Sequence, residues 1–154
     1  MAYELSTETA QVSEYTQFIV VNIGKEQYGL DIKYIDNIVR MQSITRVPKV
    51  APYLKGVINL RGEVIPVMSL RLKMGLEADE ITKNTRIIII KINHESVGII
   101  VDSVKEVVNL DMAEVEKVSF DNNKDDHSAY VMGVGKQENG LISLLDINAV
   151  LADV

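Results

Sequence analysis

The feature that most limits how this 154-residue chain can fold is an internal repeat. Residues 18–41 align without a gap on residues 87–110, and residues 53–74 align on residues 130–151 in the same order. Apolar positions match apolar positions in both blocks, but alternating apolar residues can look alike by chance, so coinciding glycines are the stronger indication. The matched glycines are Gly29 with Gly98 and Gly56 with Gly133. A repeat of this kind predicts two similar structural units.

Each unit is predicted to be mostly β, with about five short strands and short helical pieces. The run Phe18–Ile23 is apolar and β-branched, and Asn139-Gly140 is a tight-hairpin signal. Asp146 is placed to cap a short closing helix. Open sheet edges invite aggregation, so each unit should close into a small barrel. Because a unit of this size buries little surface alone, the two should pack side by side along an apolar seam, a common type of ligand site.

The domain organisation expected from this pattern is simple. Residues 1–16 have no sustained apolar period and are predicted to form a weakly ordered lead-in. Residues 17–154 are predicted to form one domain, with a first subdomain at about 17–80 and a second at about 81–152. Chain crossings between the two subdomains are allowed by this prediction.

Composition excludes several classes of function. The 16 Lys and Arg against 22 Asp and Glu give a formal net charge of -6, which disfavours non-specific binding to nucleic acids and to anionic membranes. The chain has no cysteine, so disulfides, thiolate nucleophiles and Cys-based metal sites are excluded. The polar N-terminus does not resemble a signal peptide, and no apolar run is long enough to span a membrane. A cytoplasmic protein is expected.

Motifs for catalysis or metal binding were sought and none is complete. The chain has no phosphate-binding loop, serine nucleophile elbow or HExxH sequence, and His94 and His127 are isolated. The segment from Asp121 resembles a calcium loop, but its sixth position is Asp126 instead of Gly and its twelfth is Met132 instead of Glu. The protein is therefore expected to be no enzyme and to hold no metal or cofactor.

The most specific stretch is GVINLRGEVIPV, residues 56–67. Its glycines could be ordinary turn residues, and Pro66 is compatible with an edge strand. Arg61, however, lies in a tight turn between apolar strands, and a preorganised arginine beside an apolar surface is typical of a residue that anchors a protein interface.

This stretch resembles the signature of the CheW family, the coupling proteins of bacterial chemotaxis. YGLDIKYIDNI, ITRVP and YLKGVINLRG are similar to the family's first half, and VGIIVDSVKEVVNL and LLDINAVL to its second half. The resemblance covers about residues 17–152. The motif also occurs in the regulatory domain of the kinase CheA and in CheV proteins, but the remaining residues could not hold kinase modules or a receiver domain. A free-standing CheW is the simplest interpretation.

The resemblance implies two five-stranded SH3-like barrels and a non-catalytic adaptor. Such adaptors bridge the cytoplasmic tip of chemoreceptors to the regulatory domain of the histidine kinase CheA, at receptor arrays on the inner face of the membrane. The family's receptor-binding groove between barrels corresponds here to Ile35, Asn37, Arg61, Val97, Gly98, Val104 and Val107. The kinase-binding face of the first barrel corresponds to Met41, Lys55 and Gly56.

Asn37 departs from the pattern, because some relatives carry a glutamate there. A carboxylate could pair with Arg61, whereas an amide offers only neutral hydrogen bonds. Which residue orients Arg61 is therefore left open. Three alternatives to the adaptor also remain at this point: a binding module for another modular signalling protein, a nucleic-acid-binding small barrel, which the negative charge and the 5% aromatic content disfavour, and an enzyme.

Overall fold

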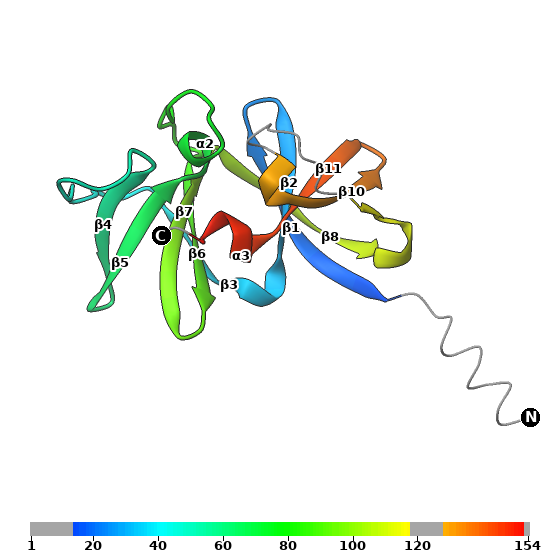
Figure 1. Ribbon diagram of the computed structural model, residues 1–154, viewed down its shortest axis with the longest axis horizontal. Helices are drawn as coiled ribbons and strands as arrows, with labels where there is room; N and C mark the ends of the chain where they lie inside the picture. The colour runs from blue at the N-terminus through cyan, green and yellow to red at the C-terminus, as the bar shows by residue number, and fades with distance from the viewer. Residues whose placement is uncertain (1–13, 118–127, 153–154) are drawn as a thin grey trace, which may run out of the picture.

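The computed structural model describes residues 14–117 and 128–152, and Figure 1 shows two lobes of β-structure side by side. The strands are β1 (Tyr15–Ile23), β2 (Glu26–Asp31), β3 (Ile35–Arg40), β4 (Leu54–Leu60), β5 (Glu63–Ser69), β6 (Arg86–Ile92), β7 (Glu95–Val101), β8 (Ser103–Asp111), β9 (Glu116–Lys117), β10 (Val131–Gln137) and β11 (Gly140–Leu145). The helices are η1 (Ile32–Tyr34), α2 (Leu70–Lys73), η2 (Met112–Glu114), η3 (Ser128–Tyr130) and α3 (Ile147–Val150).

The strands form two sheets, each curled into a small barrel. Barrel A has the strand order β8-β1-β2-β11-β10-β9, and barrel B has the order β3-β6-β7-β5-β4. The prediction of two five-stranded barrels is confirmed, with the two-residue strand β9 added at one edge of barrel A. In Figure 1 barrel B lies at the left and barrel A at the right, with α3 between them.

The sequence repeat is visible in this order, but each barrel takes strands from both halves of the chain. The β1–β2 hairpin belongs to barrel A and its repeat, the β6–β7 hairpin, belongs to barrel B. The chain changes barrels at short links: only Asp102 lies between β7 and β8, and only η1 lies between β2 and β3. At each of these links the chain leaves one sheet and enters the other. The subdomain division near residue 80 stays a prediction, and these are chain crossings of the kind it allowed.

Strands at the contact between barrels are buried on both faces. In β6, Ile87 and Ile89 point into barrel B, whereas Ile88 and Ile90 point toward barrel A. A run of four consecutive isoleucines is the composition expected of a strand that is covered on both sides. The alternation of a β-strand therefore supplies two different cores from one segment.

The two short helices α2 and α3 close their hairpins in the same way. The backbone N–H of Ser69 donates to the carbonyl of Tyr53 at 2.7 Å, and that of Asp146 donates to the carbonyl of Tyr130 at 2.8 Å. Ser69 and Asp146 are also the N-caps, accepting from the amides of the third helical residues. The predicted Asp146 cap is confirmed, and the repeat extends to individual hydrogen bonds.

Some predictions fall outside the described residues. These are most of the lead-in, residues 1–13, and most of the acidic loop from Asp121, with His127. The first strand begins at Tyr15, inside the predicted lead-in. No helix in residues 14–117 or 128–152 is long and apolar enough to cross a membrane.

Candidate interaction site

The space between the barrels is filled by the protein's own side chains. The largest apolar cluster takes buried residues from both barrels, among them Val21 and Leu30 from barrel A and Ile88 and Ile99 from barrel B. Two smaller clusters fill the interiors of the individual barrels. The predicted apolar seam is therefore a third core and not an open trench, and only its rim is accessible to a partner.

Three of the predicted receptor-binding residues lie at this rim. Ile35, Val97 and Val104 are partly buried and pack against the inter-barrel core. Ile35 on β3 and Val97 on β7 both pair with Ile90, so they flank it on the same face of barrel B. Val104 on β8 pairs with Val21 of barrel A. We call Ile35, Val97 and Val104 the seam rim.

Val107 lies near the seam rim and is more accessible than its members. It pairs with Ile19, which belongs to the inter-barrel core, so both lie in one row of barrel A. Val107 is on the edge strand β8, and 50% of its surface is exposed. An apolar side chain exposed at a sheet edge beside an apolar core is free to contact a partner.

Gly98 faces away from the seam rim, into barrel B. A Cβ atom at this position would lie 2.7 Å from Cγ2 of Ile87. The matched Gly29 is equally confined in barrel A, where a Cβ atom would lie 2.8 Å from Cδ2 of Leu144. The paired glycines of the repeat are therefore explained by close packing inside each barrel, and Gly98 itself presents no side chain to a partner.

Arg61 is exposed at the tip of the β4–β5 hairpin and has left-handed backbone torsions. Its φ is 55° and that of Gly62 is 83°, a combination for which two-residue hairpins prefer Asn-Gly. The side chain of Asn59 accepts a bond from the Gly62 amide at 3.2 Å and holds the turn. A non-glycine residue in this conformation is uncommon, and such strain concentrates at functional positions.

A hollow of about 400 Å³ connects the Arg61 hairpin with the seam rim. One wall consists of Glu63, Val64 and Pro66 from β5, and the other of residues 94–97, which end at Val97. Val64 is 63% exposed. The structure thus brings the hairpin that carries Arg61 beside Val97, which lies on one side of Ile90 while Ile35 lies on the other.

Asn37 lies at an irregularity of β3, where the pairing register with β6 shifts. Its side-chain oxygen accepts a bond from the backbone N–H of Ile38 at 2.8 Å. The amide oxygen of Asn37 thus has a local partner within β3 itself.

The three predicted kinase-binding residues differ in exposure. Lys55 is exposed and lines a surface hollow formed by the β3–β4 connection. Met41 packs against the interior of barrel B. Gly56 is buried with a φ of +142°, and a Cβ atom there would lie 2.1 Å from the carbonyl oxygen of Thr45. Met41 and Gly56 therefore support this surface from inside barrel B, whereas the exposed Lys55 can contact a partner.

A polar junction that the sequence did not predict fastens the two barrels together. The guanidinium of Arg71 on α2 donates to Asp102 through Nε at 2.9 Å and through Nη2 at 2.6 Å. The backbone N–H of Gly24, in the β1–β2 turn of barrel A, donates to the same carboxylate at 2.7 Å. The bonds from Arg71 are the largest cause that lowers the pKa of Asp102; partial burial opposes them, and the Gly24 bond adds to them. Asp102 is the single residue between β7 and β8, so the junction lies where the chain changes barrels.

A second contact joins α2 to both halves of the repeat. The ammonium of Lys73, a residue that is 8% exposed, lies 4.2 Å from the ring centroid of Tyr53 and 5.7 Å from that of Tyr130. Both distances are within the range of cation–π attraction. The alignment of Tyr53 with Tyr130 was the available sequence signal, but nothing in the sequence placed Lys73 between them.

Within residues 14–117 and 128–152, the His, Asp and Glu side chains form no group of three that could hold a metal ion. Arg71 with Asp102 and Lys73 with two tyrosines join elements of the two barrels. What the surface offers is apolar rims and charged loops, which suit protein binding.

Comparisons with known proteins agree with this architecture. The family model of the CheW-like domain matches residues 17–154 of this sequence. The chemotaxis protein CheW of Bacillus subtilis (strain 168) is 39% identical over 143 residues, covering 93% of this chain and 91% of that protein. CheW of Helicobacter pylori (strain ATCC 700392 / 26695) is 36% identical over 138 residues, covering 90% and 82%. The crystal structure of the scaffolding protein TtCheW from Thermoanaerobacter tengcongensis has a TM-score of 0.78 at 33% identity, covering 86% of this chain and 90% of that one.

The fold is thus that of a two-barrel scaffold. The chain belongs to the CheW-like domain family.

Proposed function

We propose that this protein is a non-catalytic adaptor that couples the cytoplasmic tips of chemoreceptors to the histidine kinase CheA, at receptor arrays in the cytoplasm. The observation that carries the proposal is the match to the CheW-like domain over residues 17–154, a range that includes the hairpin of Arg61 and the seam rim. The two relatives described above are named chemotaxis proteins, and the solved one a scaffolding protein.

The receptor face is the seam rim together with Val107 and Arg61. A receptor helix lays an apolar stripe against Ile35, Val104 and Val107, a mode of recognition common for amphipathic helices. Arg61 then sets the register through an ion pair or hydrogen bond. Its exposure and its left-handed backbone support this role, because an arginine gives nothing to the turn that Asn or Gly would not give at lower conformational cost.

The kinase face is the part of barrel B around Lys55, shaped by Met41 and Gly56. The receptor face and the kinase face are joined by the inter-barrel core and by the Arg71–Asp102 junction. Because close-packed interiors deform little, a displacement imposed at one face is transmitted to the other through a fairly rigid body. A rigid adaptor can therefore transmit a change in receptor occupancy to a kinase.

Arg61→Glu and Arg61→Gly test the receptor face, with Lys83→Glu as a control. Lys83 is exposed in the same barrel, and its reversal changes net charge by the same amount as Arg61→Glu. Arg61→Gly removes the guanidinium while relaxing the turn by up to about 1 kcal/mol, so its melting temperature should not fall. We expect both Arg61 variants to bind a receptor-tip fragment at least tenfold more weakly, the size of one lost interface anchor.

The readouts are binding by calorimetry and CheA autophosphorylation in receptor-containing membranes. Wild-type affinity in both folded Arg61 variants would remove Arg61 from the receptor face. A folded wild-type chain that binds neither CheA nor receptor tips would contradict the adaptor function itself and favour a different signalling partner.

A further inference from the structure

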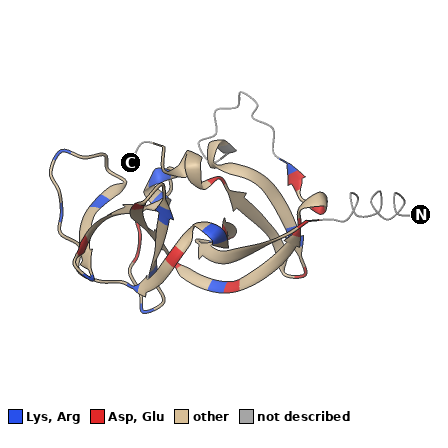
Figure 2. Cartoon of the chain, turned by 90° about the horizontal axis from the view of Figure 1, so that it is seen from below, with Lys and Arg blue, Asp and Glu red and all other residues tan. Residues whose placement is uncertain are grey.

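Positive charge is concentrated in one part of this acidic chain. Residues 37–62 contain five of the 16 cations and no Asp or Glu, although the whole chain has a formal net charge of -6. The segment covers β3, the β3–β4 connection and the edge strand β4. In Figure 2 the loop at the left edge of barrel B is marked by Lys and Arg segments. The charge is therefore gathered on one end of the molecule.

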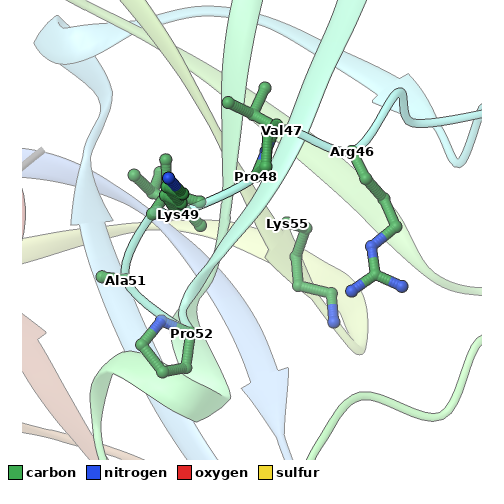
Figure 3. A pocket seen from close by; sticks show the side chains of 9 residues that line it. Arg46, Val47, Pro48, Lys49, Ala51, Pro52 and Lys55 are labelled. Carbon is green, nitrogen blue, oxygen red and sulfur yellow. The ribbon is translucent and has the colours of Figure 1, made fainter.

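Three of these cations line a single hollow of about 400 Å³, which we call the basic hollow. Its lining is Arg46, Val47, Pro48, Lys49, Val50, Ala51, Pro52, Leu54 and Lys55. Figure 3 shows Arg46 and Lys55 extending from neighbouring segments on one side of the hollow, with Lys49 on the other side of the view. No acidic side chain is among these lining residues.

The three cations have no carboxylate partner among the described residues. Within residues 14–117 and 128–152, the ion pairs are Lys33 with Asp31 and Arg71 with Asp102. Cations at the same end of a protein repel one another weakly in water, and a partner that supplies negative charge relieves this repulsion. Lys49 also has a φ of 61°, the left-handed conformation that costs a non-glycine residue about 1 kcal/mol or more.

Apolar side chains are exposed between the cations. Val47 and Val50 are each 40% exposed, and the two prolines keep the loop from forming regular backbone bonds. Exposed valines beside unpaired cations give the surface a mixed character. It suits a partner that offers carboxylates flanking aliphatic side chains.

We propose that the basic hollow binds an acidic segment of a partner protein, with a carboxylate held between Arg46 and Lys55 and an aliphatic side chain against Val47 and Val50. The charge complementarity argues for this occupant. A nucleic acid fits less well, because the rest of the sequence contains all 22 Asp and Glu against 11 Lys and Arg, and the hollow has no aromatic side chain on which a base could stack. Lys55 also belongs to the kinase face, so CheA is the expected partner. This choice of partner rests on the proposed function.

The chemistry is tested first without any assumption about the partner. The folded chain is titrated with the synthetic peptide EELDEIEE and with its uncharged counterpart QQLNQIQQ, and backbone amide shifts are followed by NMR. The acidic peptide should perturb residues 45–56 saturably, and the uncharged one should not. Equal effects of the two peptides, or no perturbation in this segment, would overturn the proposal. Tighter binding of single-stranded DNA or phosphatidylserine vesicles than of the acidic peptide would overturn it as well.

The partner is tested with the purified CheA regulatory domain. Lys49→Glu/Lys55→Glu should weaken its binding about tenfold at low salt, whereas Lys83→Glu/Lys91→Glu, which changes net charge equally at exposed sites outside the hollow, should leave it within twofold. Wild-type affinity should fall as ionic strength rises from about 0.05 M to about 0.5 M, and the affinity of the Lys49→Glu/Lys55→Glu variant should fall less.

Failure of the wild type to bind CheA, with the peptide still binding at residues 45–56, contradicts the proposed partner and leaves the acidic-segment inference standing. Binding of CheA that is insensitive to both salt and the hollow variant overturns the inference and leaves the adaptor function intact.

Discussion

Replacing Asp102 by asparagine should loosen the attachment of the two barrels without altering either binding face. The carboxylate accepts two bonds from Arg71 and one from the Gly24 amide, and these come from opposite barrels. An asparagine has one acceptor oxygen and no charge, so at least one donor loses its partner and the remaining bonds are no longer charge-assisted.

The magnitude follows from the geometry and the exposure of the pair. Hydrogen bonds to a charged group contribute about 1.5–3 kcal/mol when desolvated. The side chains of Arg71 and Asp102 are 19% and 27% exposed, so solvent screens part of this, and we expect a loss of about 1–2 kcal/mol. For a domain of this length each kcal/mol corresponds to about 2–4 °C in the melting temperature, which gives a decrease of roughly 2–8 °C.

The loss should depend on pH in a defined direction. The folded-state pKa of Asp102 is lowered, so its ionised form stabilises the fold above the unfolded-state pKa of about 4, and this contribution disappears as the pH falls through the lower, folded value. Wild type and Asp102→Asn should therefore differ fully at pH 7 and converge under acidic conditions below about pH 4. Urea unfolding at a series of pH values measures both.

The matched control is Glu106→Gln, which removes one negative charge from an exposed position of β8 in barrel A. It should change the free energy of unfolding by less than about 0.5 kcal/mol. Equal stability of Asp102→Asn and Glu106→Gln at pH 7, or a deficit of Asp102→Asn that persists unchanged in acid, would refute the idea that the ionised junction holds the barrels together.

Two further predictions concern Gly98, which faces into barrel B, and Val107, which belongs to the receptor face. Gly98→Ala should lower the melting temperature by several degrees, because its Cβ would approach Ile87 to 2.7 Å and overpacking of a core costs about 1–3 kcal/mol. Gly29→Ala should lower it in the same way in barrel A. If both variants melt at the wild-type temperature, the packing argument is contradicted. The free energy of unfolding of Val107→Glu should lie within about 0.5 kcal/mol of the wild-type value, since the side chain is half exposed. The variant should nevertheless bind receptor tips at least tenfold more weakly. Unchanged binding by calorimetry would exclude Val107 from the receptor face.

Several features of the fold were predictable because they depend on local pattern or on the repeat. The glycine pairs indicated two like barrels, and each pair marks a place where a Cβ atom has no room. The Asp146 cap depends on residues within one turn of a helix, so the sequence is enough to predict it. Arg61 could be singled out because a tight turn between apolar strands is a local feature.

The candidate site was only partly predictable, because its parts come from distant segments. The run of four isoleucines at residues 87–90 indicates that all four are buried, but it does not say whether a side chain enters barrel B or the space between barrels. For the same reason the apolar seam was predicted as a ligand site, whereas it is filled by the protein's own side chains and only its rim is accessible. Gly98 was grouped with side chains that contact a partner, although it lies on the inward face.

The sequence by itself determined the class of fold, the doubled unit and the charge imbalance of residues 37–62, because composition, period and turn chemistry are properties of neighbouring residues. Only the tertiary structure decided which hairpin joins which barrel, since that depends on pairing between strands far apart in the chain, such as β2 with β11 and β5 with β7. The tertiary structure also decided that Asp102 meets Arg71 and Gly24, and that Lys73 lies between Tyr53 and Tyr130. Contacts between residues far apart in the chain form only where packing brings the elements together, and no local pattern encodes them.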